Sequence, residues 1–243
     1  MSNQVKEFNY NPPLIPFLDV LMRDHNLIAL NKPSGLLSVP GRLEKHHDSA
    51  LSRVSSLCST AFAVHRLDMD TSGILLCALT PEARRSLGIQ FEKRLTRKLY
   101  LCEVKGRLEG QGKIAEPMRC DWENRPLQII DHKQGKAAVT FYRSLKADNR
   151  SSVILLMPYT GRSHQLRVHM AFLEHPILGD RFYAHKKTFC EVSNLRLHAA
   201  ALSFFHPTSD ETIKLVSVPD FAKHLIDKKE LLDLLDQQNF YGS

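Results

Sequence analysis

A chain of 243 residues, of which 43% are hydrophobic and 24% charged, has the composition of an ordinary globular protein and is long enough to bury a core. Its formal charge of +7 favours a polyanionic partner without naming one. Residues 220–243 hold three lysines and five acidic residues, a charge of −2, which leaves +9 on residues 1–219. We therefore expect anions to bind the body of the protein and not its C-terminal tail.

The composition also excludes several classes of protein. The five cysteines are odd in number and contain no C-x-x-C pair, so neither a zinc ribbon nor a disulfide framework is supported. Residues 1–7 lack the apolar core of a signal peptide, and no apolar run reaches the length of a membrane span. We expect a reduced, cytoplasmic protein with no membrane contact and no bound metal.

In chain order, the first elements are an arm, a strand and a short helix. Residues 1–18, which contain three prolines, predict an extended N-terminal arm, and residues 27–30 predict a short strand. Residues 48–58 predict a short helix with Asp48 as its N-cap. The apolar residues 73–79 predict a buried strand that follows a polar loop.

The segment that follows has the clearest helical pattern in the chain. Thr80 is a suitable N-cap, Pro81 suits the first turn, and Glu82 lies near the positive end of the helix dipole. Apolar side chains recur every four residues and predict one buried stripe, made of Ala83, Leu87, Phe91 and Leu95. Basic side chains on the remaining faces and just beyond the helix form a candidate phosphate-binding surface, made of Arg84, Arg85, Lys93, Arg94, Arg97 and Lys98.

The second half of the chain contains most of the predicted strands. The strand segments are 99–105, 138–145, 153–158, 197–205 and 212–218, and the second and third of these are expected to form a hairpin. Residues 164–173 predict a helix, and residues 220–243 predict a C-terminal amphipathic helix packed on the body or extending from it. Because strands and helices do not alternate regularly, we expect an α+β fold with a mixed, mostly antiparallel central sheet and flanking helices.

The polar loop ahead of residues 73–79 carries the residues most indicative of chemistry. It reads His65-Arg66-Leu67-Asp68 and ends in Thr-Ser-Gly at residues 71–73. Such loops are where rigid scaffolds display catalytic groups. From residue types alone, Asp68 fits either a nucleophile or an aspartate that caps a turn, and Arg66 fits either a phosphate-binding residue or a surface ion pair.

The sequence of this loop resembles the central motif of the RluA-type pseudouridine synthases, which carries their catalytic aspartate. Four further blocks are similar to motifs of that family and follow in its order, within roughly residues 20–205: residues 31–36, 98–100, 161–169 and 175–180. Residues 37–42 and 120–126 are most similar to the branch associated with one uridine in 23S rRNA and one in the tRNA anticodon stem-loop. Met69 and Asp70 depart from the pattern, because many relatives place a basic residue directly after the aspartate.

The resemblance implies a cofactor-independent isomerase that converts uridines of structured RNA to pseudouridine, with residues 19–219 as its catalytic domain and an active-site cleft at the centre of the sheet. Asp68 is the implied catalytic carboxylate, acting as nucleophile or through a glycal route, between which the sequence does not choose. Tyr100, otherwise an ordinary strand residue, is implied to stack on the flipped uracil, with acceptance or relay of the C5 proton as a second possible role. Arg167, otherwise a surface arginine, is implied to hold Asp68 ionised through two parallel hydrogen bonds.

The resemblance also gives Arg66 two possible roles, filling the gap left by the flipped nucleotide or binding phosphate, and makes His65 a support of the loop. The complete set expected to contact RNA is His65, Arg66, Arg84, Arg85, Lys93, Arg94, Arg97, Lys98, Arg162 and His164. His164 and His169 are five residues apart and so lie on different helix faces, which excludes a metal-binding pair.

Three rival interpretations remain. A kinase is disfavoured because Leu67 interrupts the His-Arg-Asp pattern and no glycine-rich loop or D-F-G is present. A non-catalytic RNA-binding protein fits the charge but needs no Asp68, Tyr100 and Arg167 together. Another synthase branch would act on a different RNA. The sequence leaves no space for a separate basic RNA-binding domain, so we expect a monomer that selects stem-loops of 23S rRNA or tRNA by shape.

Overall fold

The computed structural model describes residues 9–237, and every structural statement below concerns that part of the chain. Residues 1–8 of the predicted arm and residues 238–243 of the predicted C-terminal helix lie outside it. Residues 9–18 contain no helix or strand, as expected for an arm. No helix between residues 9 and 237 is long and apolar enough to cross a membrane.

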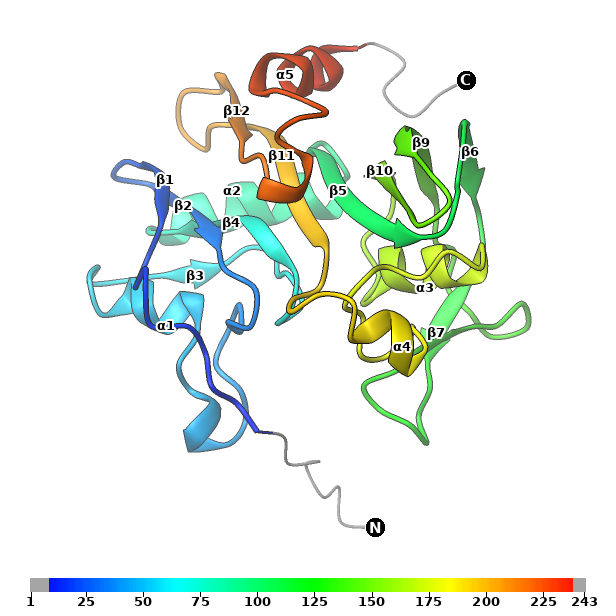
Figure 1. Cartoon of the computed structure of the whole chain (residues 1–243). Coiled ribbons are helices and arrows are strands. Elements are labelled where there is room, and N and C mark those ends of the chain that lie inside the picture. Colours follow the sequence, from blue (N-terminus) through cyan, green and yellow to red (C-terminus); the bar gives the residue numbers. More distant parts are fainter. Residues whose placement is uncertain (1–8, 238–243) are drawn as a thin grey trace.

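A ten-stranded mixed sheet runs through the molecule (Figure 1). Its order is β1-β2-β4-β11-β5-β10-β9-β6, with β12 also paired to β11 and β3 to β4. The bounds are β1 Val20–Arg23, β2 Leu27–Lys32, β3 Phe62–Ala63, β4 Ser72–Ala78, β5 Arg97–Lys105, β6 Gln111–Ile114, β9 Thr140–Ala147, β10 Ser151–Pro158, β11 Leu197–Phe205 and β12 Thr212–Val216. All pairs are antiparallel except β4 with β11, which confirms the predicted α+β fold.

A separate two-stranded hairpin, β7 (Met118–Cys120) and β8 (Gln128–Ile130), lies beside the main sheet. The helices are α1 (Ala50–Ser55), α2 (Pro81–Glu92), α3 (Gln165–Phe172), α4 (Lys186–Phe189) and α5 (Lys228–Asp236), with single 3-10 turns at Glu44–His46 and Asp220–Ala222.

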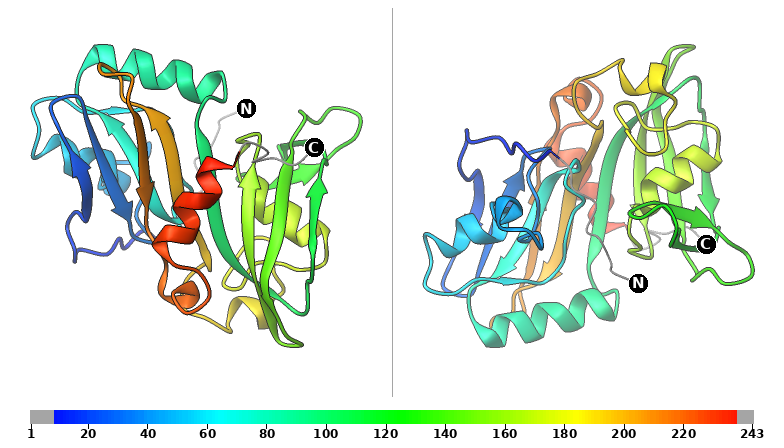
Figure 2. Two further views of the ribbon diagram at one scale, coloured as in Figure 1. Left: turned by 90° about the horizontal axis from the view of Figure 1, so that it is seen from above. Right: turned by 90° about the horizontal axis from the view of Figure 1, so that it is seen from below.

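Helices cover both faces of the sheet (Figure 2). Side chains alternate between faces along a strand, so Leu99 and Leu101 of β5 pack with the α5 leucines, whereas Cys102 packs with Leu166 and Met170 of α3. The face that carries α3 also carries α1, and α2 covers the opposite face together with α5. Tyr100 contacts both the α1 cluster and the α3 cluster, which places it at the junction between the two cores.

The only parallel pairing among the described strands is short and lies at the end of the predicted catalytic loop. It joins Ser72 to His198 and Gly73 to Ala199. Gly73 has φ +104°, and a Cβ atom there would come within 2.4 Å of the Ala199 carbonyl oxygen. Glycine is therefore required where the loop enters β4, because any larger residue would push β4 away from β11.

Several local predictions need correction. Ser49, not Asp48, caps α1, because its Oγ accepts from the Ser52 N–H, while Asp48 forms an ion pair with Arg53.

Helix α2 ends at Glu92 and Arg94 adopts φ 58°, so Leu95 is 51% exposed instead of completing the buried stripe. The C-terminal helix starts only at Lys228, after the 3-10 turn at Asp220–Ala222, and buries Leu231, Leu234 and Leu235.

Candidate active site

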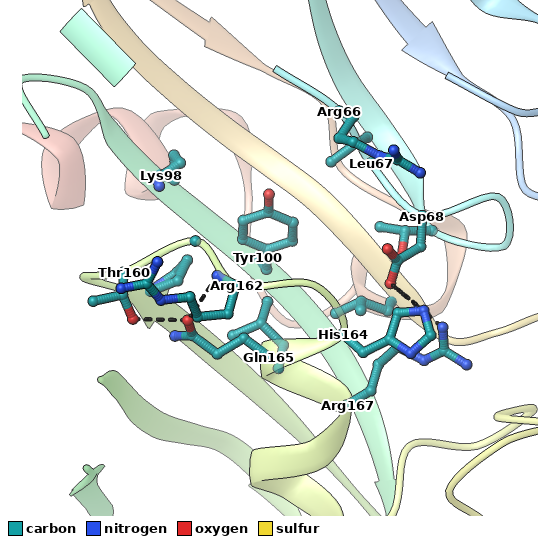
Figure 3. A pocket seen from close by; sticks show the side chains of 15 residues that line it. Arg66, Leu67, Asp68, Lys98, Tyr100, Thr160, Arg162, His164, Gln165 and Arg167 are labelled. Carbon is teal, nitrogen blue, oxygen red and sulfur yellow. Dashed lines mark hydrogen bonds and ion pairs between the residues drawn. The ribbon is translucent and has the colours of Figure 1, made fainter. Parts of the chain in front are cut away.

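A pocket opens at the centre of the sheet, between the loop that precedes β4 and the start of α3 (Figure 3). Its lining includes Arg66, Asp68, Lys98, Tyr100, Thr160, Arg162, His164, Gln165 and Arg167. The three residues expected to carry catalysis are therefore brought together, although they lie on the loop, on β5 and on α3. The arrangement follows from topology, because β5 runs between the half of the sheet that holds the loop and the half that α3 covers.

Arg167 contacts two carboxylates, but unequally. Its Nε and Nη2 atoms each donate to Asp180 at 2.7 Å, whereas its Nη1 lies 3.4 Å from Asp68 Oδ2. The two parallel hydrogen bonds predicted for Asp68 are thus made to Asp180, which is fully buried. Asp68, 24% exposed, receives the third and longer contact and faces the pocket.

The Arg167 guanidinium is also held by aromatic rings. Its carbon lies 5.1 Å from the Phe182 ring centre and 5.3 Å from that of Tyr183. Burial lowers the pKa of Arg167, but the hydrogen bonds and charge of Asp180, followed by the charge of Asp68, outweigh that effect and raise it. Arg167 therefore stays charged and immobile beside Asp68.

His164 completes the group around Asp68. Its Nδ1 lies 2.7 Å from the Tyr183 hydroxyl and its Nε2 lies 3.8 Å from Asp68 Oδ2. Because the Tyr183 oxygen already accepts from the Gln128 N–H at 2.9 Å, its own hydrogen is free to point at Nδ1. Burial lowers the pKa of His164. Where the Tyr183 hydroxyl donates to Nδ1, the neutral ring carries its hydrogen on Nε2, on the side of Asp68.

Tyr100 presents its ring to the pocket from β5 (Figure 3). Burial, reinforced by the nearby charge of Asp68, raises the pKa of its hydroxyl far above neutrality. The side chain is therefore an uncharged phenol at physiological pH, with a flat face for stacking and a hydroxyl that keeps its proton. A flat ring beside a carboxylate suits a splayed-out pyrimidine.

Lys32, at the end of β2, supports the loop that carries Asp68, a role that the sequence alone did not predict. Its buried ammonium donates to the carbonyl oxygens of Pro33, Leu36 and Met69 at 2.7–2.9 Å. Burial lowers the pKa of Lys32 to about 7 even though Asp70 and Asp68 oppose the shift. Three carbonyl acceptors match the three N–H groups of an ammonium, so Lys32 ties the loop to residues 33–36.

Ser38, in the segment that resembles the RluA branch, has a structural role that the sequence alone did not predict. Ser38 Oγ donates to the Leu67 carbonyl and accepts from the Leu67 N–H, which fixes the backbone next to Asp68. On the other side of Asp68, the departure at residues 69–70 has a structural partner, because Asp70 forms a 3.1 Å ion pair with Arg181. The loop is therefore anchored on both sides of Asp68.

Of the residues expected to contact RNA, four line the pocket: Arg66, Lys98, Arg162 and His164. His65 lies behind the loop, where its Nε2 accepts from the Leu76 N–H and its ring stacks on Phe91. Burial, with a smaller effect of the Lys98 charge, lowers the pKa of His65 to about 3, so the ring is neutral. These contacts give it a supporting role.

The other basic residues of the set lie outside the pocket. Arg84 and Arg85 are exposed on α2, and Lys93 is exposed at its C-terminal end. Arg94 stacks on Tyr159, which adjoins the pocket-lining Thr160, at 4.9 Å. Arg97 has a different use, because its guanidinium donates to the Leu235 carbonyl at the end of α5.

Comparisons with known proteins identify relatives over most of the chain. The family model described as RNA pseudouridylate synthase matches residues 26–172. The dual-specificity RNA pseudouridine synthase RluA of Haemophilus influenzae is 48% identical over 214 residues, which cover 87% of this chain and 98% of that protein. The protein of the same name from Escherichia coli is 47% identical over 216 residues, covering 88% and 98%. The solved structure of human RNA pseudouridylate synthase domain containing 1 has a TM-score of 0.75 at 27% identity, covering 93% and 97%.

The fold and the sequence comparisons together define an isomerase that acts on uridine in RNA, and the chain belongs to the RNA pseudouridylate synthase family. Within that family it is of the RluA type, as its relatives at 47–48% identity indicate.

Proposed function

We propose that this chain isomerises uridines in stem-loops of 23S rRNA and tRNA, with Asp68 as the catalytic carboxylate. The observation that carries the proposal is the meeting of Asp68, Tyr100 and Arg167 in one pocket at the centre of the sheet. The names of the relatives support more than one RNA as substrate, since these proteins are called dual-specificity RNA pseudouridine synthases.

The reaction needs no reagent beyond the groups of this pocket and water. The N1–C1′ bond of uridine breaks, the uracil turns, and C5 bonds to C1′; the C5 hydrogen leaves as a proton that passes to water, and N1 takes a proton from water in its place. Asp68 faces the space where C1′ would lie and either attacks it or stabilises positive charge that develops there. Arg167 donates from Nη1 to this carboxylate and orients it, and His164 Nε2 lies 3.8 Å from the same oxygen. Tyr100 stacks on the uracil.

The pocket mouth suits an extruded nucleotide. Arg66 and Arg162 are exposed, Lys98 is half-buried, and all three line the pocket from different segments. Burial, with a smaller effect of the Arg94 charge, lowers the pKa of Lys98. A negative phosphate at the mouth would stabilise the charged form of such a lysine. A base in an unpaired loop costs the least to extrude, which favours stem-loops as substrates.

The RNA targets are tested by mapping pseudouridines in 23S rRNA and tRNA from cells that lack the gene and carry it back as wild type or as Asp68→Asn. The proposal predicts that specific pseudouridines in both RNAs disappear in the deletion, return with wild type and do not return with Asp68→Asn. Return of all sites with Asp68→Asn would contradict the catalytic role of Asp68. Loss of sites in one RNA alone would contradict the dual specificity.

A further inference from the structure

The β7–β8 hairpin carries the only tryptophan of the chain, and that side chain is strongly exposed. Trp122 has 63% of its surface accessible, and the Arg125 guanidinium carbon lies 4.1 Å from its ring centre. A large apolar ring at the tip of a loop is normally buried or used. Arg125 stacks on one face of the indole ring, and the exposure of Trp122 leaves the other face accessible to a partner.

The tip is held by hydrogen bonds within the turn, although it is exposed. Asp121 Oδ1 accepts from the N–H groups of Glu123 and Asn124, and its Oδ2 accepts from the Asn124 side chain at 2.9 Å. Backbone hydrogen bonds close the turn, from Asp121 N–H to Leu127 and from Leu127 N–H to Asn124. A partner that binds Trp122 would therefore not need to order the loop first, which reduces the entropic cost of binding.

The hairpin is also fixed relative to the active site. The first residue of β8, Gln128, donates its N–H to the Tyr183 hydroxyl, which contacts His164 at 2.7 Å. His164 in turn faces Asp68. The same hairpin packs beside α3, on the flank of the molecule away from α1 (Figure 2, right view). An RNA that places a uridine against Asp68 is thus held at a defined position with respect to Trp122.

The charges at the tip indicate which part of an RNA would bind there. Asp121 and Glu123 flank Trp122, so residues 121–126 carry two acidic side chains against Arg125. Such a tip repels phosphate and does not serve as a backbone-binding surface. A nucleobase has a flat face and no net charge, and it stacks well on an indole backed by a guanidinium.

We propose that Trp122, backed by Arg125, is a stacking platform for one unpaired base of the substrate RNA, other than the uridine that enters the pocket. The proposal rests on the proposed function, because it takes RNA as the substrate. It adds a recognition point outside the pocket that selects stem-loops with a second unstacked base at a fixed distance from the target uridine.

The test uses the full chain with Asp68→Asn, so that RNA binds without turnover. Because Trp122 is the only tryptophan, its fluorescence reports on the tip alone. We expect a tRNA anticodon stem-loop to quench this emission, with a midpoint that matches the binding curve from anisotropy of the labelled RNA. Trp122→Ala should weaken binding about ten- to hundredfold, Trp122→Phe much less, and neither should change the salt dependence of affinity.

Phe205→Ala is the matched control, because Phe205 is an exposed aromatic residue on β11, away from the hairpin, and we expect no change in affinity. Stem-loops with an abasic nucleotide at successive loop positions should identify one position where Trp122→Ala causes no further loss. Saturable binding without quenching, or with unchanged affinity in Trp122→Ala, would overturn the platform and leave the proposed function standing. A wild-type protein that neither binds nor isomerises the stem-loop would overturn both.

Discussion

Arg167 contacts two carboxylates in this active site, and it bonds more strongly to the more buried one. Asp180 is fully buried and takes two 2.7 Å hydrogen bonds from Arg167, whereas the exposed edge of Asp68 receives one contact at 3.4 Å. Asp180 fixes the guanidinium of Arg167, and the guanidinium then orients Asp68 through a single longer contact. Asp68 thus remains available to the substrate.

This division predicts stability effects of very different size for two similar substitutions. Asp180→Asn leaves the buried charge of Arg167 without its counterion and should lower the free energy of unfolding by about 3–5 kcal/mol. Asp68→Asn should change it by less than about 1 kcal/mol, since Asp68 is partly solvated and weakly bonded. Urea unfolding of the two variants measures both values. Equal losses would show that Arg167 does not depend on Asp180.

Tyr100 allows the stacking ring to be separated from its hydroxyl. The raised pKa of Tyr100 means that the hydroxyl is protonated, and in Tyr100→Phe only this group is lost. We expect Tyr100→Phe to reduce turnover more than RNA affinity, because the ring still stacks, and Tyr100→Leu to reduce both. Single-turnover rates and binding curves for the two variants distinguish these effects. Full activity in both would make Tyr100 an ordinary strand residue.

At the scale of elements, a buried histidine joins the strands beneath the catalytic loop. His198 of β11 contacts Ser72 of β4 through Nδ1 at 2.8 Å, and its Nε2 donates to the carbonyl of Ser217, just after β12, at 3.1 Å. Burial lowers the pKa of His198 to about 4 against the weaker effect of the Ser217 hydrogen bond. The short β4–β11 pairing therefore relies on a neutral ring.

The pH dependence of stability follows from this shift. Between pH 6.5 and pH 4 the unfolded chain binds a proton at His198 and the folded chain does not, so protons favour unfolding. The stability contribution is fully present above pH 6.5 and is lost as the pH falls toward 4, with a slope of at most about 1.4 kcal/mol per pH unit. His198→Gln should show a shallower decline in urea unfolding over this range. Parallel curves for the two proteins would contradict the assignment.

Local sequence signals predicted elements well where the cause is local. Thr80 caps α2 as expected, and the β9–β10 hairpin follows from two apolar runs joined by a polar turn. The errors arose where tertiary contacts decide. Asp48 is drawn away from its capping position by Arg53, and the left-handed backbone at Arg94 ends α2 one turn before the apolar spacing does. The pairing of residues 72 and 198 has no local signal at all.

At the scale of the whole molecule, the site is assembled from segments that are remote in sequence. The roles of Asp68, Tyr100 and Arg167 came from family resemblance, and no periodicity would have placed them together. Asp180 and Lys32 lie in segments that resemble family motifs, but the resemblance implied no role for either side chain. The sequence predicted a basic surface around α2 that included Arg97. It could not show that Arg97 instead bonds the end of α5, because that contact joins residues 138 positions apart.

The positive charge of the body predicts how affinity depends on salt. Lys93→Gln with Arg94→Gln removes two exposed charges at the end of α2 and should flatten the fall of log affinity with log salt by up to about 1.5, for all RNA targets alike. Arg97→Gln is the matched control, which should lower thermal stability and leave the slope nearly unchanged. An unaltered slope in the double variant would place the RNA surface elsewhere, near Arg42 and Arg181.

The central claim, that Asp68 performs the isomerisation, is tested most directly by tritium release from stem-loop RNA labelled at uridine C5. Wild type should release tritium in proportion to the pseudouridine formed. Asp68→Asn should bind the same RNA with similar affinity and lose at least about three powers of ten in rate, because a neutral amide neither attacks C1′ nor stabilises positive charge there. A rate within about tenfold of wild type would contradict the account.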